Sequence, residues 1–189
     1  KNQNGEWVEP KNVKGNNNKL KDNKNLKVET GKIEKMSKSK KNVVDPNDII
    51  NLYGADTARW FMLSDSPPEK DIKWSESGIK GAWKICQKIW NLIIQNREYL
   101  SMNAASQDIV FEGNALSLMK LVHQNLKSVT ESIEKFQMNV AIAKVFELVN
   151  AISKFETVKE DDKHAVAQSL KILIRIIEPI VPHLAEECW

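Results

Sequence analysis

The sequence predicts a mainly α-helical protein: a helical bundle, preceded by a small α/β region and a short segment of strands and loops. After Ser75, apolar residues recur every three or four positions almost without interruption, which is the pattern of amphipathic helices. Short loops separate four such stretches, as in a bundle. Before residue 46 the chain is instead rich in Lys, Asn and Gly, with only short extended pieces between turns.

The first 45 residues form the strand and loop segment. Extended pieces at 6–8 and 26–29 are separated by polar turns, and this spacing favours hairpin-like strands. We expect a further strand at 31–34, which runs into a polar loop over 35–42.

Two short helices should follow this loop. Asp45 and Pro46 favour a helix start, because Asp accepts hydrogen bonds from free backbone N–H groups and Pro suits the first helical position. Gly54 should end this helix, and a second one is expected over 55–64. We expect residues 71–74 to form a further strand after the second helix.

The bundle should begin with a helix from Ser75 to about residue 100, followed by a polar loop over 101–113. Trp83 and Trp90 fall at helical spacing and are assigned to the core rather than to base stacking. The expected buried stripes of the four helices are Ile79, Trp83, Cys86, Trp90 and Ile93; Met119, Val122, Leu126, Val129, Ile133 and Phe136; Ile142, Val145, Phe146, Val149 and Ile152; and Val166, Leu170, Leu173, Ile174 and Ile177.

Charge is unevenly distributed along the 189 residues, whose formal net charge is +3. Residues 1–45 hold 12 Lys and 6 acidic residues, a net +6, whereas 46–189 hold 16 Lys and Arg against 19 acidic residues, a net −3. A basic segment ahead of an acidic body is typical of contact with nucleotide or nucleic-acid phosphates. The alternative is a Lys- and Asn-biased chain that exposes Lys wherever solvent is tolerated.

Several classes of protein are excluded. The two cysteines form no CxxC pair and join no His/Cys cluster of zinc-ligand spacing, so we predict no disulfide scaffold and no protein-bound metal. This cysteine usage fits a reducing, cytoplasmic setting. No run of 18 apolar residues occurs, so no membrane partner is expected. The first residue is not Met and Trp189 falls within a helical pattern, so we expect an excised part of a longer protein.

The loop over 35–42 carries the strongest chemical signal. Lysine ammonium groups there can meet phosphate oxygens, while serine hydroxyls and backbone N–H groups add neutral donors. From composition alone, a solvated basic turn is an equally good interpretation. The sequence contains no GxxxxGK[ST] and no GxGxxG motif, so it predicts neither a P-loop nor a dinucleotide-binding fingerprint as another phosphate site.

Lys35-Met36-Ser37-Lys38-Ser39 matches the KMSKS signature of class I aminoacyl-tRNA synthetases letter for letter. The segments 42–46, 53–59 and 65–75 resemble the leucyl branch of this family. Residues 178–189 resemble its Pro-His-x-Ala-Glu-Glu-x-Trp block near the end of the helical domain. The isoleucyl, valyl and methionyl branches share KMSKS and the Tyr-Gly-Ala-Asp block, so a part of one of those is the alternative.

This resemblance implies an enzyme that activates leucine with ATP, releases pyrophosphate and transfers the leucyl group to tRNA(Leu). It implies that Lys38 and Lys35 are catalytic. It also implies that these lysines bind ATP together with Met36, Ser37 and Ser39. Mg²⁺ would come with ATP. The leucine pocket would lie mostly outside these residues.

The resemblance also implies three parts: residues 1–31 at the edge of the catalytic domain, 32–76 with the KMSKS loop and a stem-contact fold, and 77–189 as the helical anticodon-binding domain. The family's other signature, His-Ile-Gly-His, is absent. We therefore expect the chain alone to be inactive. A non-catalytic RNA-binding helical module is a further alternative.

Three lysines form a candidate tRNA-binding flank on the first bundle helix: Lys80, Lys84 and Lys88. An ordinary solvated helix face is an equally good interpretation. Asp56 and Arg59 are three residues apart and could pair on their helix in a structural role. His183 is expected to pack or to cap a helix rather than to catalyse.

Overall fold

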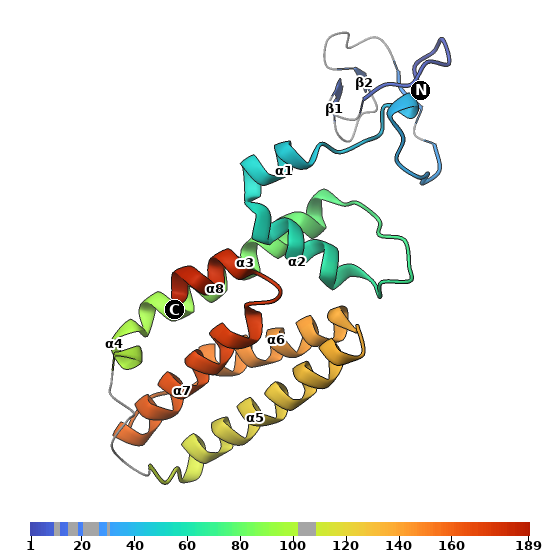
Figure 1. Cartoon of the computed structure of the whole chain (residues 1–189). Coiled ribbons are helices and arrows are strands. Elements are labelled where there is room, and N and C mark those ends of the chain that lie inside the picture. Colours follow the sequence, from blue (N-terminus) through green and yellow to red (C-terminus); the bar gives the residue numbers. More distant parts are fainter. Residues whose placement is uncertain (10–11, 15–18, 21–26, 30, 102–108) are drawn as a thin grey trace. The chain divides into compact units, whose positions relative to one another are not determined.

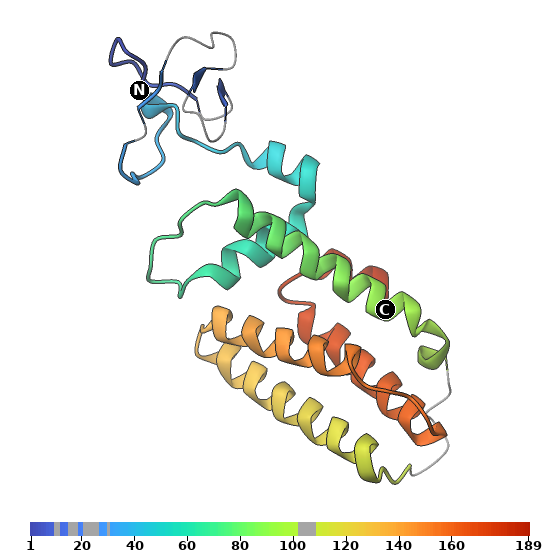
Figure 2. The same cartoon turned by 180° about the vertical axis from the view of Figure 1, so that it is seen from behind.

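The computed structural model describes residues 1–9, 12–14, 19–20, 27–29, 31–101 and 109–189. The chain forms two compact units, Lys1–Leu52 and Tyr53–Trp189. The predicted mainly helical architecture is confirmed, and most of the helices lie in the second unit (Figures 1 and 2).

The first unit contains a two-stranded antiparallel sheet, β1 (Val13–Lys14) and β2 (Lys19–Leu20), in which Val13 pairs with Leu20. A one-turn 3-10 helix, η3 (Lys38–Lys40), follows. The helix α1 (Pro46–Tyr53) begins in this unit as predicted, because the Asp45 carboxylate accepts a hydrogen bond from the Asn47 N–H at 2.9 Å.

The strands predicted at 6–8 and 31–34 are wrong, and of the piece at 26–29 only 27–29 lie in the described part, where Lys27 forms an isolated bridge. Residues 2–6 form a local turn instead, in which the Asn2 side chain accepts hydrogen bonds from the N–H groups of Asn4 and Glu6. Residues 31–34 have no regular secondary structure, and Ile33 is 74% exposed. An extended segment becomes a strand only when a neighbour supplies the ladder.

The second unit starts with α2 (Ala55–Asp65), α3 (Glu76–Gln95) and α4 (Arg97–Leu100). The Ser75 hydroxyl accepts the Gly78 N–H at 2.9 Å and caps α3 as predicted. The helix predicted to run to residue 100 breaks at Asn96, whose side-chain amide donates to the Leu92 carbonyl at 2.7 Å. The strand predicted at 71–74 is absent, and Trp74 packs edge-on against Phe61 at 5.2 Å.

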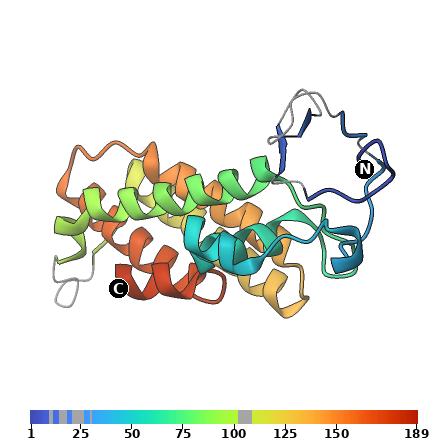
Figure 3. The ribbon, with the colours of Figure 1, turned by 90° about the horizontal axis from the view of Figure 1, so that it is seen from above.

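The bundle continues with α5 (Gly113–Glu134), α6 (Met138–Ser153), α7 (Glu160–Ile177) and α8 (Pro182–Cys188). Helices α5, α6 and α7 pack against one another, α2 packs on α3 and α6, and α8 lies against α7 and α3 (Figures 1 and 3). No helix in the described ranges is long and apolar enough to cross a membrane.

The buried stripe of α7 is confirmed throughout, and that of α6 is confirmed except at Phe146, which is 37% exposed and meets Trp60 edge-on. On α5, Met119, Val122 and Val129 are buried, while Leu126 and Ile133 are half-buried. The prediction for Phe136 is wrong: it follows the end of α5 with a φ of +56° and is 75% exposed.

The buried face of α3 also differs from the predicted one. Ile79, Cys86 and Ile93 are buried, but Trp83 is 41% exposed and Trp90 is half-buried. The face is completed by the smaller residues Ala82, Ile85, Ile89 and Leu92. The assignment of Trp83 to the core is therefore wrong.

Candidate functional site

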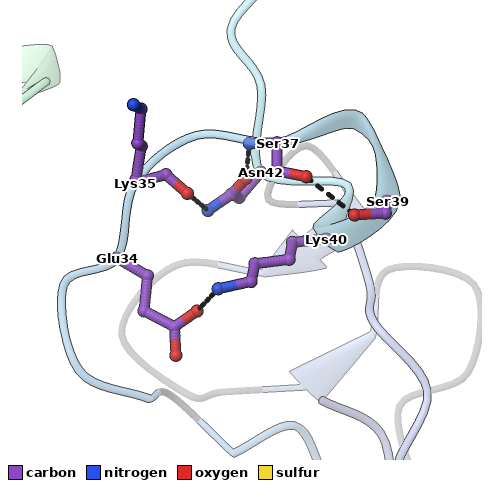
Figure 4. A network of polar contacts seen from close by, with 6 residues as sticks. All are labelled: Glu34, Lys35, Ser37, Ser39, Lys40 and Asn42. Atoms are coloured by element: carbon purple, nitrogen blue, oxygen red, sulfur yellow. Dashed lines mark hydrogen bonds and ion pairs between the residues drawn. The ribbon is translucent and has the colours of Figure 1, made fainter.

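The loop over 35–42 is held in a defined shape by its own polar groups (Figure 4). The Asn42 amide oxygen accepts a hydrogen bond from the Ser37 N–H at 2.7 Å, and its amide nitrogen donates to the Lys35 carbonyl at 3.4 Å. The Ser37 and Ser39 hydroxyls share a hydrogen bond of 2.7 Å. One short side chain thus ties the start of the loop to its end.

The turn at the loop's tip is a single 3-10 turn. The N–H groups of Lys40 and Lys41 donate to the carbonyls of Ser37 and Lys38, each at 3.1 Å. Lys41 adopts the left-handed conformation, with φ 51° and ψ 31°, and thereby ends the turn. This geometry brings the Ser37 and Ser39 side chains together.

Lys40 has an acidic partner within the first unit. Its ammonium forms an ion pair with the Glu34 carboxylate and lies 5.8 Å from the centre of the Trp7 ring. The hydrogen bond from Lys40 and the charge of its ammonium lower the pKa of Glu34 below its usual value. Lys40 therefore contributes to the loop's structure.

Lys35 and Lys38, the two predicted catalytic lysines, are exposed, and neither forms an ion pair with any residue in the described part of the chain. In Figure 4 the Lys35 side chain points away from the network that holds the loop. Met36 is 43% exposed. The loop thus contains two kinds of lysine: Lys40 is bound to a carboxylate, whereas the ammonium groups of Lys35, Lys38 and Lys41 have no ion pair within the described ranges.

The candidate tRNA-binding lysines have three different surroundings on α3. The Lys80 ammonium lies 4.0 Å from Glu76, and the Lys88 ammonium donates to the Asn150 side-chain oxygen on α6 at 2.7 Å. Lys84 has no ion pair within the described ranges. Lys84 and Lys88 line a pocket between α3 and the connection from α6 to α7.

Asp56 and Arg59 do not form the predicted pair with each other, because Arg59 reaches the turn between α7 and α8 and Asp56 reaches the first turn of α8. Arg59 donates to the carbonyls of Ile180 and Pro179, each at 3.0 Å. The Asp56 carboxylate accepts the Leu184 N–H at 2.6 Å and lies 2.8 Å from His183 Nδ1. We call these four hydrogen bonds the α2–α8 clasp; it joins two of the segments that carry the family resemblance.

The two cysteines are free thiols, of which Cys86 is buried and Cys188 is half-buried. Burial raises the pKa of the Cys86 thiol to about 11 and that of Cys188 to about 11, so both remain protonated near neutral pH. Among the described residues, no three His, Cys, Asp or Glu side chains gather where they could hold a metal ion.

Asn42 holds the loop in shape, and the sequence did not predict this role. A short amide side chain at the end of a loop is a signal, since Asn readily hydrogen-bonds nearby backbone groups. The partners of Arg59 gave no local signal, because they lie 120 and 121 residues further along the chain.

Two segments of the chain match known protein families. Residues 26–75 match the family "tRNA synthetases class I (I, L, M and V)", and residues 116–189 match the "anticodon-binding domain of tRNA ligase". Both matched families belong to the aminoacyl-tRNA synthetases, and the first is that of the class I enzymes.

Similar full-length proteins indicate which branch of the class I synthetases this chain resembles. The chain is 47% identical to the leucine–tRNA ligase of Parvibaculum lavamentivorans, over 84% of the chain and 18% of that protein. It is 45% identical to that of Rhizobium leguminosarum, over 97% of the chain and 22% of that protein. The chain thus spans about a fifth of the length of these relatives.

A solved structure agrees with the sequence matches. A leucyl-tRNA synthetase of Agrobacterium radiobacter K84, in ternary complex with tRNA and LeuAMS, superposes with a TM-score of 0.74 at 26% identity. The match covers 82% of this chain and 20% of that one. The chain belongs to the leucyl-tRNA synthetase family.

Proposed function

We propose that this chain works as part of a leucine–tRNA ligase, which activates leucine with ATP and joins it to tRNA(Leu). The segment supplies the ATP-contacting KMSKS loop and a helical tRNA-binding region, and it has no activating activity by itself. The observation that carries this proposal is the loop of Figure 4, whose backbone is pinned by Asn42 while Lys35 and Lys38 stay free of carboxylates. The family relatives support the same interpretation.

In this proposal Lys38 stabilises the negative charge that builds on the departing pyrophosphate, and Lys35 makes a second phosphate contact. Met36, Ser37 and Ser39 complete the ATP-contacting loop; the shared hydrogen bond of the two serines fixes their orientation. A lysine on a flexible stem suits a charge that must follow a moving phosphate. Mg²⁺ arrives bound to the ATP phosphates, and we assign no residue of this chain as its ligand.

We assign a separate role to each of the three parts that the sequence predicts. Residues 1–31 border the catalytic domain, 32–76 carry the loop and its stem-contact region, and 77–189 form the anticodon-binding domain. Lys80, Lys84 and Lys88 contact tRNA phosphates, and leucine binds mostly outside these residues. We place the enzyme in the cytoplasm.

A hybrid enzyme tests the proposal. The matching segment of the Rhizobium leguminosarum leucine–tRNA ligase is replaced by this chain, and leucine-dependent ATP–pyrophosphate exchange and leucylation of tRNA(Leu) are measured. The hybrid should be active, whereas the purified chain alone should show no exchange. A non-catalytic RNA-binding module would leave the hybrid inactive.

Lys38→Ala in the hybrid should lower the rate of leucyl-adenylate formation by about 10²–10³-fold with a much smaller change in the KM for ATP. Lys38→Arg should restore activity only partly, because a planar guanidinium replaces a compact ammonium. Lys32→Ala is the matched control, since Lys32 is an exposed lysine just before the loop. If Lys38→Ala and Lys32→Ala had equal rates in single-turnover experiments, the loop would be a solvated basic turn.

A further inference from the structure

A pocket of about 530 Å³ lies in the second unit, between α3 and the connection from α6 to α7. Its floor is apolar, because Leu92, Ile152 and Val166 are at most 7% exposed. Its rim is polar and carries the amide side chains of Gln87, Asn91, Gln95 and Asn96. An apolar floor with a few polar groups around it is typical of small-ligand sites, which span about 300–1,000 Å³.

The charge around the pocket selects for an anion. Lys84 and Lys88 both line it, and the described lining residues include no carboxylate. This contrasts with residues 46–189 as a whole, whose net charge is −3. Lys88 donates one of its N–H groups to Asn150, which fixes its ammonium at the pocket's edge, while Lys84 has no ion pair within the described ranges.

Trp83 adds a planar surface at the same place. Trp83 lines the pocket and is 41% exposed, whereas its neighbour Ala82 faces the core and is 5% exposed. An indole placed between water and a positively charged pocket gives a surface on which a nucleic-acid base can stack. The aromatic ring, the side-chain amides and the two lysine ammonium groups together match three parts of a nucleotide: the base, the base edge and the phosphate.

We infer that this pocket receives an unpaired nucleotide of the bound tRNA, with its base stacked on Trp83 and its phosphate near Lys84. The inference rests on the proposed function and deepens it by locating a contact on the helical region. The nucleotide must be unpaired, because bases within an RNA duplex are stacked on one another and cannot reach a side-chain ring.

The full 189-residue chain and fluorescently labelled tRNA(Leu) test the inference by anisotropy at two salt concentrations. Trp83→Ala should weaken binding roughly 5- to 150-fold, the range measured for loss of one base–aromatic stack, and should leave the salt dependence unchanged. Lys84→Ala should instead reduce the slope of log K against log salt by about one. Trp83→Phe should retain most of the affinity, because a phenyl ring still stacks.

Two controls stand outside the pocket. Trp189→Ala removes an indole that is 68% exposed, and Lys120→Ala removes an exposed lysine on α5. Both should bind tRNA as the unchanged chain does, and circular dichroism should show the same helix content in every variant. A blunt RNA duplex should not distinguish Trp83→Ala from the unchanged chain.

The outcomes separate the two proposals. If the unchanged chain binds tRNA and Trp83→Ala behaves like Trp189→Ala, the pocket is not a nucleotide site, while the proposed tRNA contact stands. If the unchanged chain shows no salt-dependent binding, the proposed tRNA contact itself fails. If UMP or AMP alone quenches the tryptophan fluorescence of the unchanged chain, but not that of Trp83→Ala, without competing with tRNA, the pocket is a free-nucleotide site and the inference is overturned.

Discussion

Asn42 and Lys38 perform different tasks within one loop of the first unit. Asn42 holds the backbone through Ser37 and Lys35, and Lys38 offers a charge that nothing in the described part of the chain neutralises. Charge and shape can therefore be changed one at a time, by mutation of one residue or the other.

Asn42→Ala tests the shape alone. It removes two hydrogen bonds, each worth about 0.5–1.5 kcal/mol net, so the loop should occupy its ordered form less often. The two bonds together correspond to about 1–3 kcal/mol, so adenylate formation in the hybrid enzyme should slow by at most roughly 5- to 150-fold, and by less than for Lys38→Ala measured beside it. Asn47→Ala is the control, since only the backbone N–H of Asn47 is held, by Asp45.

The ion pair between Lys40 and Glu34 should depend on pH. The pKa of Glu34 is lowered in the folded loop, so the pair contributes above the usual glutamate pKa and is lost as pH falls through the lowered value. Because Lys40 lies near Trp7, the indole N–H signal of Trp7 in an NMR titration from pH 6 to pH 3 should report this loss. Glu34→Gln should abolish the transition; a transition that persists would come from another group.

At the scale of single elements, Gly78 and Gly81 form a matched pair on α3. Alanine favours a helix over glycine by roughly 1 kcal/mol. A Cβ on Gly78, however, would lie 2.5 Å from the Phe61 ring and 2.7 Å from the Ser75 hydroxyl that caps the helix. A Cβ on Gly81 would meet nothing within 4 Å.

Gly81→Ala should therefore raise the free energy of unfolding by about 0.5–1 kcal/mol, and Gly78→Ala should lower it by about 1–3 kcal/mol through overpacking. Urea denaturation followed by circular dichroism measures both. Equal stabilisation by the two substitutions would show that α2 can shift away from α3 without cost.

The helices were predictable because their signals are local. Asp45 and Ser75 each cap the helix that follows them, and the apolar period of α7 is buried throughout. The strands were not, because a strand exists only with a partner, and nothing near 31–34 or 71–74 specifies one. The face of α3 was misassigned because tryptophan is large and often half-exposed, while smaller residues complete the core.

For the functional residues too, local signals were predictable from the sequence and contacts between distant segments were not. The KMSKS letters located the loop, and Lys35 and Lys38 have no carboxylate partner in the described part of the chain, but the same is true of Lys41, which lies outside the signature. The pocket beside Trp83 combines α3 with the connection after α6, more than 55 residues away in sequence, so no local pattern could reveal it.

At the scale of the second unit, the α2–α8 clasp joins the segment that follows the KMSKS loop to the last described helix. Arg59→Ala removes two charged hydrogen bonds from a side chain that is largely exposed, so the expected loss of unfolding free energy is about 1–2 kcal/mol. Arg97→Ala, which removes an exposed arginine at the start of α4, should change it by less than about 0.5 kcal/mol. Urea denaturation of both variants decides the matter, and equal midpoints would mean that the clasp does not stabilise the unit.

The clasp also sets an order of events on the ribosome. Pro179 and Ile180 are made 120 and 121 residues after Arg59, and Leu184 follows Asp56 by 128 residues. At about 5–20 residues per second, the interval is roughly 6–25 s. During translation, α3, α5, α6 and α7 are therefore synthesised while Asp56 and Arg59 still face water. Helix α2 is among the first parts of the unit to leave the exit tunnel, yet it gains these partners only when α8 emerges.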